Sequence, residues 1–200
     1  MQNTSISPLV YSPDEYDIVA LPDHGSAEKI VKIQNLLKEL MGDSIWLTPS
    51  QVLHSTLMEI ICDTEYRDLS REEHFMQWCT RYNDIAREVI AQFQPIDITL
   101  SELRVSPAAI ILKAADPGPF NVIRQALLKN TVLPTQTKIP PDIIHCTIAR
   151  YSKEVCVDDI MGQVSSIPVN INFQIREFKL MKDLGPDFHP TVLQTYRLGA

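Results

Sequence analysis

One five-residue pattern occurs twice in the chain and constrains the fold more than any other feature. Leu53-His54-Ser55-Thr56-Leu57 and Ile144-His145-Cys146-Thr147-Ile148 share the order apolar, His, any residue, Thr, apolar, and their histidines lie 91 residues apart. Each copy follows a short apolar run at nearly the same distance, with Ile18 36 residues before His54 and Ile110 35 residues before His145. One amphipathic helical segment separates run and motif in each case. The repetition predicts two β-α-β lobes of matched length.

Hydrophobic periodicity and turn residues predict the other elements. Helices are expected from a Ser26 N-cap to Met41, from Arg71 to Gln92 behind a Ser70/Glu73 capping box, over 119–129 and over 157–164. Strands are expected over 16–21, 44–47, 51–60, 96–105, 108–114, 143–151, 169–181 and 192–198. Helices and strands are mixed and neighbouring strands can pair as hairpins, so the predicted class is α+β.

The duplicated elements predict one bilobal domain with pseudo-two-fold symmetry, in which antiparallel sheets line a central cleft. The 200 residues hold no Pro/Ser linker long enough to separate independent domains. The expected domain covers residues 1–200, with lobe 1 over about 13–92, lobe 2 over about 93–200, and strand exchange between lobes allowed. A monomer is the expected state.

Alternation along a strand places the histidine and threonine of each motif on one face. His54 and Thr56 share a face, as do His145 and Thr147. If the lobes pack with pseudo-two-fold symmetry, the two pairs meet across the cleft. The same alternation predicts Tyr151 on the histidine face and Arg150 on the opposite one.

Two imidazoles and two hydroxyls around one centre suit acid–base cleavage of a phosphodiester. A neutral imidazole takes a proton from the attacking water or hydroxyl, and an imidazolium protonates the leaving oxygen, because the reference pKa of histidine lies near working pH. The hydroxyls of Thr56 and Thr147 donate to the non-bridging oxygens. This scheme needs no metal and no cofactor, and two histidines lack a third and fourth ligand at the spacing of a zinc site.

Other candidate residues have two readings. Arg150 either binds a phosphate or anchors its strand, and Tyr151 either stacks on a base or packs in the core. The isolated His24, His74 and His189 are expected at the surface. Glu59 and Asp63 follow the first motif, but no pairing into a carboxylate dyad is predicted for them.

Composition excludes several classes of function. A net charge of −7 disfavours a protein that coats nucleic acid, duplex DNA included. The longest apolar runs are too short for a membrane span and the N-terminus does not resemble a secretory signal. None of the four cysteines forms a Cys-x-x-Cys pair, and Cys146 is expected to behave as a small hydrophobic residue. We expect reduced thiols and a cytoplasmic location.

The two motifs resemble those of the two-histidine (2H) phosphoesterase superfamily, whose members carry two His-x-Thr/Ser motifs on pseudo-symmetric lobes. Trp46-Leu47-Thr48-Pro49 precedes the first motif and Ala149-Arg150 follows the other. Both flanks resemble those of the 2′,5′-RNA-ligase-like and cyclic nucleotide phosphodiesterase branch, whereas the acidic segment 63–73 departs from that branch.

The resemblance implies hydrolysis or transesterification of 2′,3′-cyclic or 2′,5′-linked phosphodiesters without a metal. It implies that His54 and His145 are acid and base and that Thr56 and Thr147 bind the phosphate. The sequence therefore predicts a metal-independent phosphodiesterase acting on a small nucleotide or an RNA terminus.

Two alternatives remain open at this point. One is a module that binds a nucleotide or cyclic oligonucleotide in the same cleft without turnover. The other is an RNA ligase running the reverse reaction, which would need RNA contacts that this acidic chain does not show.

Overall fold

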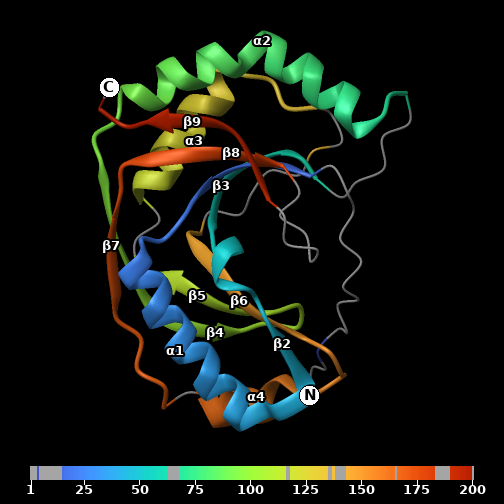
Figure 1. Cartoon of the computed structure of the whole chain (residues 1–200), viewed down its shortest axis with the longest axis vertical. Coiled ribbons are helices and arrows are strands. Elements are labelled where there is room, and N and C mark those ends of the chain that lie inside the picture. The colour runs from blue at the N-terminus through green and yellow to red at the C-terminus, as the bar shows by residue number, and fades with distance from the viewer. Residues whose placement is uncertain are drawn as a thin grey trace.

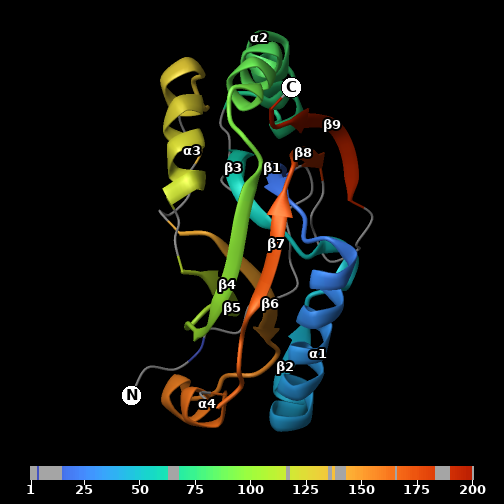
Figure 2. The same ribbon diagram turned by 90° about the vertical axis from the view of Figure 1, so that its left-hand side faces the viewer.

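Among the residues that it describes, the computed structural model contains two antiparallel sheets, each associated with two of the four α-helices (Figure 1). It describes residues 4, 15–62, 68–115, 118–134, 137, 143–164, 166–182 and 190–199. The predicted position of His189 and that of Asp63 lie outside these residues. In both views α2 (Arg71–Ala91) and α3 (Gly118–Asn130) lie in the upper half of the molecule, and α1 (His24–Met41) and α4 (Val157–Val164) lie in the lower half (Figures 1 and 2).

The first sheet has four strands and lies in the same half of the molecule as α2 and α3. Its strands are, in spatial order, β3 (Ser55–Ile61), β1 (Tyr16–Ala20), β8 (Glu177–Lys182) and β9 (Thr191–Arg197). The long helix α2 (Arg71–Ala91) contacts β3 and β9, and α3 (Gly118–Asn130) contacts β3. β3 is therefore an edge strand covered by helices.

The other sheet has five strands and lies in the same half of the molecule as α1 and α4. Its strands are, in spatial order, β2 (Ile45–Leu47), β6 (His145–Tyr151), β5 (Ile110–Ala114), β4 (Ile96–Val105) and β7 (Ile171–Ile175). Helix α1 (His24–Met41) contacts β2, β6 and β7, and α4 (Val157–Val164) contacts β4. All strand pairs in both sheets are antiparallel.

Strands cross between the two halves of the chain. β2 comes from the first half of the sequence but pairs with β6 in the five-stranded sheet, whereas β8 and β9 come from the C-terminal end but extend the four-stranded sheet. The single strand predicted over 169–181 is wrong, because the chain leaves one sheet at Arg176 and enters the other. β7 and β8 look continuous in sequence because both alternate apolar and polar residues.

Two predicted boundaries also differ from the structure. Helix α1 begins after Asp23, whose carboxylate accepts from the Ser26 N–H at 2.7 Å, so Asp23 and not Ser26 is the N-cap. The strand predicted over 51–60 begins at Ser55, because Ser50–Val52 forms a 3-10 turn. The capping box at Ser70 and Glu73 is confirmed, with both of its hydrogen bonds present.

Aromatic contacts join the helices to the first sheet. The Tyr16 ring of β1 stacks on Phe75 of α2 with centroids 3.8 Å apart, and Phe120 of α3 lies 5.4 Å from Phe178 of β8. All four rings are buried within one apolar cluster that extends through both sheets. The apolar cores of the two ends are thus continuous.

No helix among the described segments is long and apolar enough to cross a membrane.

The stack on Tyr16 predicts a large stability difference between two neighbouring residues of α2. Phe75→Ala should lower the free energy of unfolding by about 3–5 kcal/mol, because it removes a buried ring and leaves a cavity. Met76→Ala is the control, because Met76 is 53% exposed. Urea unfolding followed by circular dichroism measures both, and equal losses in the two variants would contradict the packing.

Candidate active site

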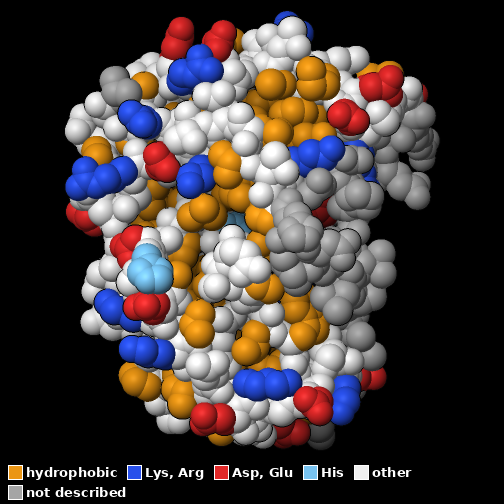
Figure 3. Space-filling model, in the orientation of Figure 1, with side chains coloured by type: hydrophobic (Ala, Val, Ile, Leu, Met, Phe, Trp, Pro, Cys, Tyr) orange, Lys and Arg blue, Asp and Glu red, His pale blue; other side chains and the backbone are white. Residues whose placement is uncertain are grey.

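The two histidine motifs come together where strands β3 and β6 contact each other. His54 lies directly before β3, and His145 is the first residue of β6. The His54 backbone lies within hydrogen-bonding reach of the Cys146 thiol, and the two imidazoles are close enough for His54 to lower the pKa of His145. A small area of histidine surface shows near the middle of one face, recessed between hydrophobic side chains (Figure 3).

Both motif strands carry a β-bulge at the same place. Along the β1–β3 ladder Ile18 pairs with Met58 and Val19 with Thr56, which leaves Leu57 as the extra residue. Along the β5–β6 ladder Ile110 pairs with Ala149 and Ile111 with Thr147, which leaves Ile148 as the extra residue. The bulged residue lies three positions after the histidine in each motif, so the repeat extends to backbone geometry.

The bulge reverses the faces of the residues that follow it. An extra residue shifts the alternation by one, so Arg150 joins His145 and Thr147 on one face of β6. The burial along β6 agrees: these three residues are half-buried, and the other four are buried. The prediction that Arg150 lies opposite His145 is therefore wrong. We call the face that carries the motif threonines of each sheet its motif face.

Tyr151 lies on the other face and not near the histidines. Its side chain is fully buried in the apolar cluster, and its hydroxyl donates to the Ser106 carbonyl at 2.9 Å. Burial raises the pKa of Tyr151 to about 12. Of the two roles predicted for Tyr151, this burial agrees with packing in the core and not with stacking on a base. The predicted face of its ring is wrong, because simple alternation takes no account of the bulge.

The hydrogen-bond partner of the His54 ring shows which of its nitrogens carries the proton. Its Nδ1 lies 2.7 Å from the Val52 carbonyl oxygen, and since a carbonyl only accepts, Nδ1 carries the proton. The Nε2 atom of the neutral ring is then able to accept a proton. Burial lowers the pKa of His54 below 6.5, the Val52 carbonyl opposes this shift, and Arg150 adds to it.

His145 has more positive neighbours than His54. Burial is the largest cause that lowers its pKa below 6.5, and His54, Arg124 and Arg150 lower it further. Arg150 thus acts on both imidazoles. Two roles were predicted for Arg150, binding a phosphate or anchoring its strand. Its position near both imidazoles suits the first of them.

The two threonines have matching cross-strand neighbours. On the motif face of the first sheet Thr56 lies beside Val19, and Lys179 follows on the next strand. On the five-stranded sheet Thr147 lies beside Ile111, and Arg104 follows on the next strand. Each motif therefore has a hydroxyl, an apolar neighbour and a cation in one row, an arrangement suited to an anionic ligand with an apolar part.

The position in the first sheet that corresponds to Arg150 is occupied by an acidic residue, Glu59. Glu59 follows the Leu57 bulge as Arg150 follows the Ile148 bulge, and it pairs across the ladder with Asp17. Asp17 is buried, and desolvation followed by Glu59 raises its pKa well above 3.8. The sequence offered no carboxylate neighbour for Glu59, and the structure places Asp17 there because β1, far away in sequence, pairs with β3.

Sequence reasoning missed two buried polar residues beside the motifs, Gln34 of α1 and Arg124 of α3. Gln34 is 3% exposed and Arg124 is 1% exposed. Each interrupts the apolar stripe of its helix, and a polar side chain on a buried stripe is the signal that would have found it.

Other predicted positions lie away from the motifs. His24 is at the surface with its side chain 91% exposed, as expected, and His74 is half-buried on α2. Cys146 is 2% exposed, and burial raises the pKa of its thiol to about 12, so it remains a neutral thiol. Within the described ranges no group of three or more His, Cys, Asp or Glu side chains is placed to hold a metal ion.

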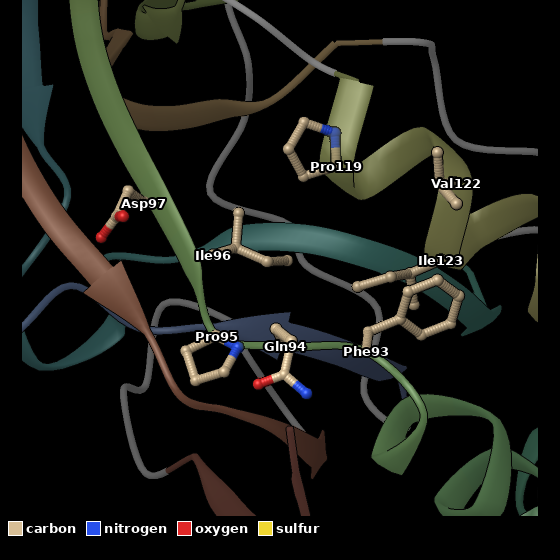
Figure 4. A pocket seen from close by; sticks show the side chains of 8 residues that line it. All are labelled: Phe93, Gln94, Pro95, Ile96, Asp97, Pro119, Val122 and Ile123. Atoms are coloured by element: carbon tan, nitrogen blue, oxygen red, sulfur yellow. The ribbon is translucent and has the colours of Figure 1, made fainter. Parts of the chain in front are cut away.

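A pocket of about 350 Å³ lies apart from the histidine motifs, between the start of β4 and helix α3 (Figure 4). Phe93, Pro95, Ile96, Pro119, Val122 and Ile123 give it mainly apolar walls, together with Gln94 and Asp97. None of these residues belongs to either motif, so the pocket is not part of the candidate site.

The position of Arg150 predicts its effect on both histidines. Arg150→Met should raise the pKa of His54 and of His145, because it removes a cation that lowers each. NMR titration of the imidazole signals measures this change. Lys153→Met, which removes an exposed cation three residues later, is the control, and unchanged histidine pKa values in the Arg150 variant would contradict the geometry.

The comparisons with known proteins agree with this architecture. A crystal structure of TT0787 from Thermus thermophilus superposes with a TM-score of 0.62 at 15% identity, covering 93% of this chain and 98% of that one. For apo E. coli LigT the TM-score is 0.62 at 14% identity, covering 94% and 99%. For Kluyveromyces marxianus Usb1 it is 0.57 at 12% identity, covering 96% and 100%. These likenesses show the fold and confirm the predicted α+β class.

The family is shown by sequence. No curated protein matches the chain. A family model described as the 2′-5′ RNA ligase superfamily matches residues 51–187, a span that includes both histidine motifs. This match confirms the predicted resemblance and supports a phosphoesterase-type enzyme. The chain belongs to the 2′-5′ RNA ligase superfamily of two-histidine phosphoesterases.

Proposed function

We propose that this chain is a phosphodiesterase that uses His54 and His145 as acid and base and needs no metal. Its substrates are 2′,3′-cyclic or 2′,5′-linked phosphodiesters in small nucleotides or at RNA termini. The observation that carries the proposal is the meeting of two motif histidines, with Arg150 near enough to lower the pKa of both.

The proposed proton transfers follow from the state of each ring. A neutral imidazole removes a proton from the attacking water or hydroxyl, and an imidazolium gives one to the leaving oxygen. His54 is suited to accept a proton at Nε2, because its Nδ1 proton is held by the Val52 carbonyl. Burial keeps both rings largely neutral in the free protein, and a bound phosphate favours the protonated form of either ring by its negative charge.

Thr56 and Thr147 are proposed to bind the non-bridging oxygens. Both are half-buried on the motif faces, two residues after their histidines, and residues so spaced lie about 6.5–7 Å apart along a strand. Their hydroxyls can donate to oxygens on which negative charge develops. Arg150 supplies the positive charge that offsets this development.

The comparisons support a nucleotide as the ligand. E. coli LigT has been crystallised with 3′-AMP, with ATP, with NADP⁺ and with phosphate. All of these carry phosphate, and the cations and apolar neighbours beside the threonines suit such molecules. The net charge of −7 favours a short substrate over a long duplex. We propose a cytoplasmic location, as the cysteine pattern predicts, and a monomeric state.

Activity should be retained in EDTA and lost with either histidine. We expect the wild type to hydrolyse 2′,3′-cyclic nucleotides or 2′,5′-linked dinucleotides in EDTA, with products separated by chromatography. His54→Ala and His145→Ala should each lose at least about 10²-fold in kcat, because each removes one proton transfer.

His24→Ala is the matched control, because it removes an exposed histidine. Turnover that disappears in EDTA would contradict the metal-independent mechanism. Stoichiometric nucleotide binding without product would favour the binding-module alternative.

The pH dependence should be bell-shaped and displaced towards acid. Catalysis needs one neutral and one protonated imidazole, and both pKa values lie below 6.5 in the free protein, so kcat/KM should reach its maximum below about pH 6.5. The profile of kcat should lie at higher pH, because the bound phosphate raises both pKa values. A flat kcat/KM profile between about pH 5 and 8 would reject histidine acid–base catalysis.

A further inference from the structure

Gln34 and Arg124 occupy matching positions in the two halves of the chain. Gln34 follows Ile33 in the buried stripe of α1, and Arg124 follows Ile123 in the buried stripe of α3. Gln34 lies 20 residues before His54, and Arg124 lies 21 residues before His145. The two side chains are therefore counterparts in the same repeat that contains the motifs.

Each side chain donates hydrogen bonds to the bulge of the motif in the other half. Arg124 Nε donates to the Leu57 carbonyl at 2.8 Å, and Arg124 Nη2 donates to the Thr56 carbonyl at 3.2 Å. Gln34 Nε2 donates at 2.7 Å to the Ile148 carbonyl and at 2.7 Å to the Thr48 carbonyl. Leu57 and Ile148 are the extra residues of the two bulges, so the contacts are equivalent and crossed.

These bonds reach the backbone at the point where the sheet ladder is interrupted. The residue inserted at a bulge is left out of the regular pairing, and a buried carbonyl needs a donor. The Ile148 carbonyl also accepts from the Thr48 N–H at 3.0 Å, so Gln34 adds a second donor there and links the bulge to the Thr48 carbonyl. Arg124 supplies the donor for the Leu57 carbonyl from α3, which covers the edge of β3 that no strand of its sheet pairs with. Asn121 holds the guanidinium in this position, accepting from Nη1 at 2.9 Å.

We propose that Gln34 and Arg124 are positioning residues, each of which holds the bulge that aims the catalytic side chains of the opposite motif. Arg124 holds the bulge that follows Thr56, and Gln34 holds the bulge between Thr147 and Arg150. The catalytic part of the proposal rests on the proposed phosphodiesterase function. The two positioning residues differ in charge, so the repeat is symmetric in geometry but not in electrostatics.

The positive charge of Arg124 lowers the pKa of His145. The charged groups that face His145 among the described residues come from four elements: His54 before β3, Arg124 on α3, Arg150 on β6, and Lys113, its cross-strand neighbour on β5. Lys113 is paired with Glu102 at 3.2 Å. After burial and His54, Arg124 is the next cause that lowers the pKa of His145. Gln34 carries no charge and exerts no such effect on His54.

The first experiment replaces Arg124 with a neutral donor. Arg124→Gln should raise the pKa of His145 in an NMR titration and lower kcat by about 10-fold or more, because misplacement by about 1 Å can cost up to about 10²-fold. Lys129→Gln, which removes an exposed cation from the same helix, should leave both quantities unchanged. The titration does not require turnover, so it tests the charge effect even if the proposed activity is absent.

A companion experiment removes the neutral counterpart. Gln34→Leu should lower kcat by about 10-fold or more with little change in KM, because it removes the two hydrogen bonds from α1 that help to hold the bulge that places Thr147 and Arg150. Asn35→Leu, at the exposed neighbouring position, is the control. Arg124→Lys keeps the charge but loses the two-carbonyl geometry, so it should lower kcat and leave the pKa of His145 near its wild-type value.

Several outcomes would overturn the proposal. A folded Arg124→Gln protein with wild-type kcat and a wild-type His145 pKa would do so, and so would wild-type kcat in Gln34→Leu. Loss of cooperative folding in both Arg124 variants would assign Arg124 a purely structural role and also reject it. A wild type without turnover, combined with the expected His145 shift, would reject the phosphodiesterase and keep the electrostatic effect of Arg124.

Discussion

The paired bulges in β3 and β6 are the constraint on which the candidate site depends. A regular strand after His145 and Thr147 would point Arg150 away from them, and one inserted residue, Ile148, reverses this. The same insertion at Leu57 brings Glu59 onto the motif face of the first sheet. A local change in pairing thus decides which charged residue lies on the motif face of each sheet.

Burial sets the chemical character of the site. His54 and His145 lose solvation as strands β3 and β6 meet, and this loss is the largest cause that lowers both pKa values. The cations that surround them act in the same direction. Both causes favour the neutral form of the two rings in the free protein, and the negative charge of a bound anion would act in the opposite direction.

The sequence predicted much of this molecule, and its errors at the candidate site share one origin. The repeat of His54-Ser55-Thr56 and His145-Cys146-Thr147 indicated the family and the pair of motif strands. The capping box at Ser70 marked the start of α2, because such signals act within one turn of helix. Tyr151 and Arg150 were assigned to incorrect faces, because strand alternation contains no information about a bulge that forms only when β6 pairs with β5.

Local patterns in the chain are enough to establish the family, the α+β class and the two histidine–threonine pairs, because a repeated short motif carries all three. Only the folded molecule shows on which faces Arg150 and Tyr151 lie and that Asp17 pairs with Glu59. The same is true of the crossed hydrogen bonds from Gln34 and Arg124. Bulge register, strand exchange and buried hydrogen bonds all depend on pairing between residues that are distant in sequence, and no local pattern records that pairing.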